Sequence, residues 1–94
     1  MTQKATGAND AGHITTNATT TLKSGACVLL AVTVNSKGSG NTATIYDSKT
    51  GSGKVLAVID TTQPGTFLYN AQLDNGLTIV TAGGTPADIT VSYT

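Results

Sequence analysis

The sequence predicts an all-β protein, a compact antiparallel two-sheet sandwich of jelly-roll-like architecture. Short segments rich in Thr, Val, Ile and Tyr recur along the chain, and turn-forming residues separate them at regular spacing. No segment shows the sustained 3.6-residue periodicity of an amphipathic helix. The 94 residues are enough for one domain, and about seven short strands at this spacing are typical of a sandwich or a barrel.

The first half of the chain is expected to form three strands. Ile14–Leu22 alternates along its length, with Ile, Thr, Ala and Leu on one side and Thr and Asn on the other. Ala26–Asn35 begins as a continuous apolar run and becomes alternating from Val32 onward. A turn, SKGSG, follows at 36–40, and Thr42–Asp47 is a strand of Thr, Ile and Tyr residues.

Four more strands are expected in the second half, where the turn residues between them are stronger. They are Lys54–Asp60, Thr66–Leu73, Leu77–Thr81 and Asp88–Thr94. Pro64-Gly65 is a turn dipeptide, and Asn75-Gly76 indicates a hairpin because both residues tolerate positive φ.

Strand alternation also predicts the core, since every second side chain of a strand points to the same face. In Thr66–Leu73 this rule places Phe67 and Tyr69 on one face and Leu68 on the other. The side chains expected to be mostly buried are Val28, Leu30, Val32, Ile45, Val58, Phe67, Leu77, Ile79, Ile89 and Val91.

The chain is expected to divide into an extended N-terminal arm, residues 1–12, and a single β-sandwich domain, residues 13–94. The arm is polar and cannot bury apolar surface by itself. It has no apolar h-region, so no secretory signal is expected. The longest apolar run, Ala26–Val32, is too short to span a bilayer as a helix, and we expect no membrane partner.

Low charge is the most unusual feature of the composition. Charged residues make up 11% of the chain and balance to a net charge of zero, against about 25% in typical domains. The lysines are scattered, whereas a nucleic-acid-binding protein needs a cationic footprint, so no nucleic acid is expected as a partner. Low charge also gives little repulsion between copies of the chain.

Few residues have the chemistry of a catalytic site. His13, the only histidine, lies at the edge of the arm, where the geometry of a hydrolase triad is hard to hold. Cys27, the only cysteine, lies among hydrophobic residues and is expected to be buried and unreactive. The segment Gly51–Lys54 lacks the spacing of a phosphate-binding loop.

Aspartates occur at strand ends, where they have two interpretations. Aspartate oxygens are ligands for Ca²⁺, but aspartate is also an ordinary turn residue. The residues concerned are Asp47, Asp60, Asp74 and Asp88. Their spacing does not match a known calcium loop, so we predict no catalytic residue, no metal ligand and no cofactor.

Two segments of the chain resemble small structural proteins of tailed bacteriophages. The resemblance lies in Thr44-Ile45-Tyr46-Asp47 and in a C-terminal pattern, GLTIVT at 76–81 followed by GTPADITVSY at 84–93. It covers residues 22–94. Some of these proteins are capsid cement (decoration) proteins with a jelly-roll fold, and the shared positions are strand and turn residues without a functional site.

The resemblance implies a capsid cement protein that binds the major capsid protein on the outside of the head. Such a protein would be made in the bacterial cytoplasm and end on the virion surface. The apolar run Ala26–Val32 points to both faces of its strand, which favours a homo-oligomer, and analogy favours a trimer over a dimer. The alternative is a tail-fibre or spike module that binds host glycan, although aromatic residues are scarce. An enzyme is not expected.

Overall fold

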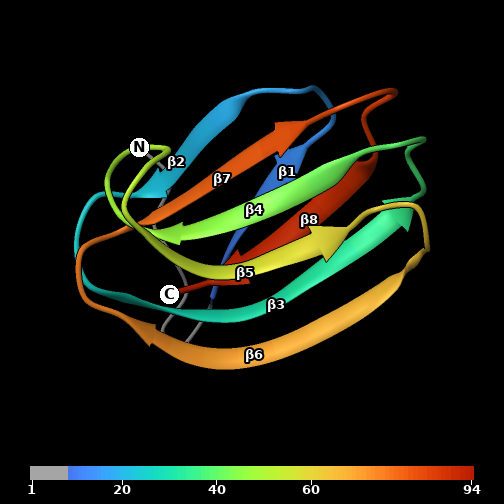
Figure 1. The fold of residues 1–94 in the computed structure, drawn as a ribbon. Coiled ribbons are helices and arrows are strands. Elements are labelled where there is room, and N and C mark those ends of the chain that lie inside the picture. The colour runs from blue at the N-terminus through green and yellow to red at the C-terminus, as the bar shows by residue number, and fades with distance from the viewer. Residues whose placement is uncertain (1–8) are drawn as a thin grey trace, which may run out of the picture.

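The computed structural model describes residues 9–94, and all regular secondary structure in this range is β-strand (Figure 1). The eight strands are β1 (Asp10–Ile14), β2 (Thr19–Lys23), β3 (Cys27–Ser36), β4 (Thr42–Asp47), β5 (Lys54–Asp60), β6 (Gly65–Leu73), β7 (Leu77–Ala82) and β8 (Asp88–Tyr93).

The strands form two four-stranded antiparallel sheets that pack face to face. The first sheet has the order β1-β8-β3-β6 and the second has the order β2-β7-β4-β5. The chain follows the path of one long hairpin rolled into two sheets, because β1 pairs with β8, β2 with β7, β3 with β6 and β4 with β5. This is the topology of an eight-stranded jelly roll, and the predicted two-sheet antiparallel sandwich is confirmed.

Strand positions agree closely with the sequence, except near the N-terminus. Strands β4 and β5 have the predicted bounds, whereas the predicted strand Ile14–Leu22 is divided by a turn between β1 and β2. Strand β1 begins at Asp10, so residues 10–12 of the expected arm belong to the first sheet. Of the remainder of the expected arm, Asn9 precedes the strand, and residues 1–8 lie outside the described residues.

The core lies between the inner faces of the two sheets. Leu29, Ile45 and Leu77 are completely enclosed, and all the members of the core come from strands except Ala87, which directly precedes β8. Six of the predicted core residues are buried as expected: Val32, Ile45, Leu77, Ile79, Ile89 and Val91.

Two core predictions in β3 are wrong because a β-bulge changes the direction of the side chains. Val28 and Leu30 are only half-buried, while Leu29 is fully enclosed. Leu30 is inserted relative to β8, which pairs Leu29 with Tyr93 and Ala31 with Ser92. A bulge of this kind reverses the alternation of the strand, so Cys27 and Leu29 face the core in place of Val28 and Leu30.

Two further core predictions, both on edge strands, are wrong, Val58 because it faces outward and Phe67 because its strand has an open side. Val58 is 63% exposed and Phe67 is 37% exposed. Val58 pairs with Thr44 on the outer face of the second sheet. Phe67 pairs with the buried Val32 and so points inward, but β6 has no neighbour on its other side.

A second bulge lies in β6, but this strand still alternates as predicted. Leu29 pairs with Ala71 and Ala31 pairs with Leu68, so β6 contains an additional residue between Leu68 and Ala71. Asn70 has a φ of 49° there, a left-handed conformation that asparagine tolerates better than most residues. Phe67 and Tyr69 share the inward face, since Phe67 pairs with the buried Val32 and Tyr69 packs against the core.

The loops at one end of the sandwich are connected by a buried asparagine. Asn41 is 1% exposed. Its Nδ2 donates to Asn17 Oδ1 at 2.7 Å and to the Gly83 carbonyl at 2.8 Å. Its Oδ1 accepts from Thr61 Oγ1 at 2.7 Å. One side chain thus joins the loop before β4 to the three other loops at this end.

The opposite end is held by a buried aspartate. Asp47, at the end of β4, accepts hydrogen bonds from the backbone amides of Asn75 at 2.9 Å and Asp74 at 3.1 Å. The Asn75 amide is the largest cause of a lowered pKa for the Asp47 carboxyl, because it stabilises the carboxylate. Asp47 therefore has a structural role and fixes the β6–β7 turn.

Candidate interaction surfaces

The structure does not gather the chemistry-bearing residues into one site. Within residues 9–94, no three His, Cys, Asp or Glu side chains lie close enough to hold a metal ion, and this part of the chain encloses no pocket. Asp60 accepts from the backbone amide of Thr62 at 3.0 Å and from its hydroxyl at 2.7 Å. The Thr62 hydroxyl is the main cause of the lowered pKa of Asp60, which acts as a turn residue.

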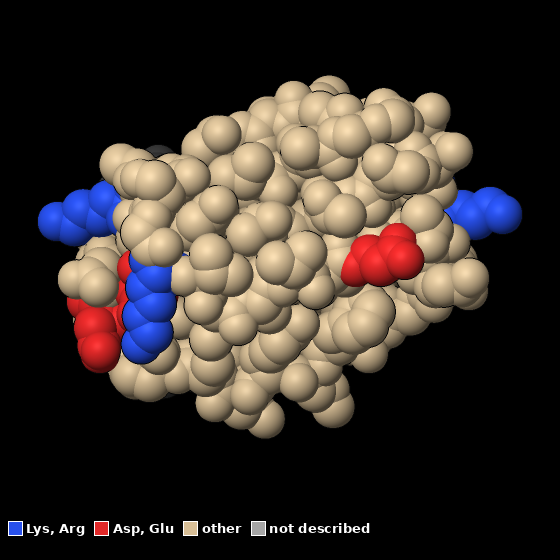
Figure 2. Space-filling model, viewed as in Figure 1, with Lys and Arg blue, Asp and Glu red and all other residues tan. Residues whose placement is uncertain are grey.

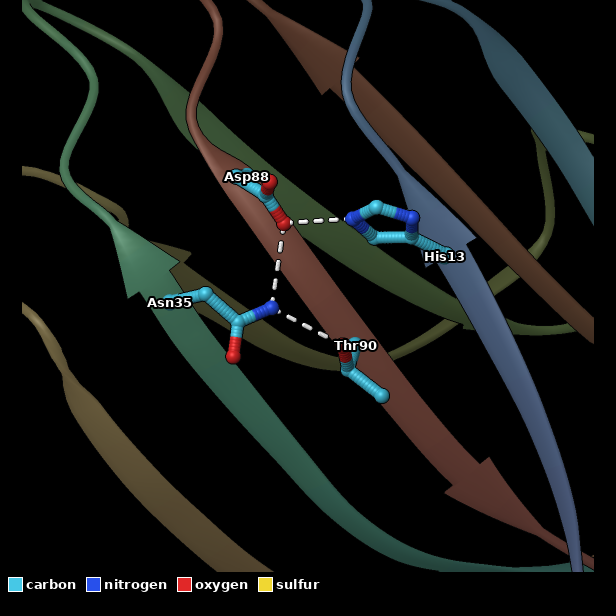
Figure 3. Close-up of polar contacts among 4 residues, drawn as sticks. All are labelled: His13, Asn35, Asp88 and Thr90. Atoms are coloured by element: carbon cyan, nitrogen blue, oxygen red, sulfur yellow. Dashed lines mark hydrogen bonds and ion pairs between the residues drawn. The ribbon is translucent and has the colours of Figure 1, made fainter.

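His13 belongs to a polar cluster on the outer face of the first sheet (Figure 3). Its Nε2 lies 2.6 Å from Asp88 Oδ1, and the side chains are 61% and 37% exposed. Asn35 Nδ2 donates to Asp88 Oδ1 at 3.0 Å and to Thr90 Oγ1 at 2.8 Å. The bond from Asn35 is the largest cause of the lowered pKa of Asp88, and the bond from His13 comes next.

This polar cluster connects three adjacent strands, β1, β8 and β3. Its hydroxyl group, on Thr90, is hydrogen-bonded to Asn35, so the cluster is not arranged as a nucleophile beside a base. Sequence reasoning missed the partnership of His13 with Asp88, because the two residues are far apart along the chain and meet only through the pairing of β1 with β8.

Cys27 lies in the core, as predicted. It is 5% exposed and faces inward from the start of β3. Burial is the largest influence on its thiol and raises the pKa, because desolvation disfavours the thiolate. A buried thiol with a raised pKa is a poor nucleophile.

The glycine-rich segment between β4 and β5 covers part of the second sheet. The Thr78 hydroxyl donates to the Ser48 carbonyl at 2.8 Å, and the Thr21 hydroxyl donates to the Lys49 carbonyl at 3.2 Å. Thr78 is completely buried although it pairs with Tyr46 on the outer face. The segment therefore folds back over β7 and β2, and Gly51 lies where a Cβ atom would meet Val80 and Thr19.

The outer face of the second sheet carries a broad surface without charge, formed by Thr44, Tyr46, Val55, Val58 and Val80. These side chains are cross-strand neighbours on β4, β5 and β7. Figure 2 shows this side of the molecule, on which charged side chains gather toward the two ends and only one acidic side chain interrupts the wide central area. We call this surface the uncharged face. The centres of protein interfaces are likewise poor in charge and enriched in tyrosine.

A second surface lies along one side of the sandwich, where the last strand of each sheet is exposed. The large apolar side chains most exposed among residues 9–94 all lie there: Val55 (48%), Val58 (63%), Phe67 (37%) and Leu68 (77%). They belong to β5 and β6, the end strands of the two sheets; in Figure 1 β6 is the lowest strand and β5 lies above β3. We call this surface the apolar edge. Val55 and Val58 belong to both surfaces.

Both surfaces are extended and poor in charge: β6 carries no charged residue, and β5 carries Lys54 and Asp60 at its two ends. The described residues form no helix that could cross a membrane. Comparison of the chain with protein-family models, curated proteins and solved structures finds no match.

Proposed function

We propose that this protein is a capsid cement (decoration) protein of a tailed bacteriophage, which binds the outer surface of the major capsid protein lattice and stabilises the head. The observation that carries the proposal is the uncharged face, a surface of Thr, Val and Tyr side chains on the second sheet. The partners are the major capsid protein and further copies of this chain, and the location is the virion surface after synthesis in the host cytoplasm.

The composition of the uncharged face suits contact with another protein. Val55 and Val58 supply apolar area, while Thr44 and Tyr46 supply hydroxyl groups that can donate or accept hydrogen bonds. Burying apolar area contributes about 25 cal/mol per Å². Since none of the side chains that form the face is charged, their burial avoids the largest penalty that association can impose.

Rigidity is a second feature that supports the proposal. Asn41 fixes the loops at one end of the sandwich and Asp47 fixes the turn at the other. A surface that is already ordered loses little conformational entropy on binding. The resemblance of residues 22–94 to small phage virion proteins points to the same function.

Capsids that lack this protein provide the test. The purified chain should cosediment with them at a copy number comparable to that of the major capsid protein, and it should raise the temperature at which the heads open. Thr44→Lys, which places a charge in the centre of the uncharged face, should weaken binding at least tenfold. Thr15→Lys, at an exposed turn position, is the matched control and should bind like the wild type.

Other outcomes would contradict the proposal. A few copies per virion, located at the tail, would favour the glycan-binding fibre module instead. Absence of the chain from purified virions, or equal binding by the Thr44→Lys and wild-type proteins, would refute the role of this face.

A further inference from the structure

We infer that the apolar edge is a contact between two copies of this chain, related by a two-fold axis that sets β5 against β5 and β6 against β6 in antiparallel orientation. The inference does not depend on capsid binding, because it concerns the purified protein alone. It would extend each four-stranded sheet across the axis into the sheet of a second copy.

Strand β6, one half of the apolar edge, lacks the charge and proline that usually protect an edge strand. Proteins guard free edges with charged residues, proline or a covering segment, because an open edge pairs readily with another chain. Strand β6 has the sequence GTFLYNAQL, with no charge and no proline. Leu68 is 77% exposed in the middle of it, so burial against a partner removes a large apolar side chain from water.

Only part of β6 is regular enough to pair with a strand of another copy. The bulge at Asn70 interrupts the strand, but Gly65–Leu68 pairs with β3 residue by residue and has no strand on its other side. Within this stretch Thr66, Phe67 and Leu68 are all exposed. It is therefore the segment of β6 expected to meet its own copy.

The charge pattern of β5 favours a second copy of the chain as the partner that covers the apolar edge. The charged residues of β5 are Lys54 at its start and Asp60 at its end, and both are exposed. Antiparallel pairing of β5 with itself brings Lys54 of each copy to Asp60 of the other, which gives two complementary contacts. A two-fold contact requires a surface that complements itself, and this charge pattern does so.

Other occupants fit the apolar edge less well. The opposite side of the sandwich, β1 and β2, has no large exposed apolar side chain among the described residues. Head-to-tail contact would therefore place an apolar surface on a polar one. Residues 1–8, MTQKATGA, contain one large apolar side chain and cannot match the apolar edge. Two-fold contact thus favours a dimer, whereas the resemblance favoured a trimer.

Sedimentation equilibrium of the purified wild-type protein tests the inference directly. We expect a monomer–dimer equilibrium. Leu68→Lys should raise the dimer dissociation constant about tenfold or more, because it removes an apolar contact and adds like charges across the axis. Ala11→Lys, an exposed position on the opposite edge strand β1, is the matched control and should leave the dissociation constant unchanged.

A charge-exchange experiment checks the antiparallel arrangement. Lys54→Asp and Asp60→Lys should each weaken the dimer at low salt, and the double variant should restore it, because the two charges merely exchange places across the axis. Within one copy the two residues are about 20 Å apart along the strand, beyond the screening length of about 8 Å at physiological salt. Rescue therefore reports contact between copies, and circular dichroism confirms that each variant is folded.

Several results would overturn the inference. They are a strict monomer at high protein concentration, a trimer, unchanged association of Leu68→Lys, and a double variant no better than either single variant. None of these results bears on capsid binding, which is measured with capsids and with Thr44→Lys. The two proposals can therefore fail separately.

Discussion

Leu29 and Phe67 are large apolar residues on adjacent strands, yet only Leu29 is enclosed. Leu29 is 0% exposed and Phe67 is 37% exposed. We expect Leu29→Ala to lower the free energy of unfolding by about 2–5 kcal/mol, because it leaves a closed cavity. Phe67→Ala should cost less than about 1.5 kcal/mol, since its site is already open to water. Urea denaturation at a protein concentration that keeps the chain monomeric measures both values.

The difference between the two variants is the critical result. A loss above about 3 kcal/mol for Phe67→Ala would mean that the ring is enclosed in the monomer. That outcome would also remove Phe67 from the apolar edge and leave Leu68 and the two valines of β5 as its members.

Asp47 provides a prediction about pH. Its lowered pKa means that the carboxylate is favoured in the folded state, so its contribution to stability is present above about pH 4, the ordinary aspartate value. The contribution is lost as the pH falls below that value through the lowered pKa. Asp47→Asn should therefore have a lower melting temperature than the wild type at pH 7, and the difference should shrink toward pH 3.

Asp74→Asn is the control for this experiment, because Asp74 is exposed and only its backbone amide contacts Asp47. Its melting temperature should follow that of the wild type across the pH range. A difference between Asp47→Asn and the wild type that is equal at pH 7 and pH 3 would show that the charge of Asp47 does not matter.

At the scale of the elements, one buried side chain can position several loops at once. Asn41 hydrogen-bonds to groups in each of the other loops at its end of the sandwich. Asn41→Ala leaves buried partners without hydrogen bonds and should lower the free energy of unfolding by at least about 2 kcal/mol. Asn35→Ala, at an exposed asparagine, should change it by less than about 0.5 kcal/mol.

Hydrogen exchange adds a local check to the Asn41 variant. Amides of the loop residues joined by Asn41, including that of Ala87, should lose protection before those of the strands. Uniform loss of protection across the whole sandwich would contradict the idea that Asn41 acts on this end.

Strand positions could be predicted from the sequence, but the inward faces of β3 and β5 could not. Strands β4 and β5 have the expected bounds because turn residues mark both of their ends. Burial failed at Val28 and Leu30 in β3, where an inserted residue reverses the alternation. A bulge depends on the pairing of neighbouring strands, and a single sequence does not contain that information. Val58 failed because it is followed by another apolar residue, Ile59, so alternation does not say which of the two faces inward.

Only some properties of the candidate surfaces could be predicted from the sequence. Low charge was evident from composition and gave no indication of a cationic surface. The apolar edge depends on the order of strands in both sheets, so Val58 and Phe67 were assigned to the core, while Leu68 was placed on the opposite face from Phe67 without its edge position being known. The partnership of His13 with Asp88 likewise arises from the meeting of β1 and β8.

At the scale of the whole molecule, the strand order makes folding a long-range process. Strand β1 pairs with β8 and β2 pairs with β7, so the two halves of the chain must meet before either sheet is complete. Proteins dominated by such contacts fold in about milliseconds to seconds. Stopped-flow refolding should give a relaxation in that range, whereas a microsecond relaxation would mean that local hairpins alone carry the stability.

The pairing of β1 with β8 also determines how the molecule responds to force. Asp10 and Tyr93 are cross-strand partners, so a pull applied at these two residues acts at the same end of an antiparallel strand pair. The hydrogen bonds of such a pair lie perpendicular to the strands and would be loaded one after another, as in a zipper. The sandwich should therefore open at low force when held by these strands, and should resist more strongly when pulled along its length.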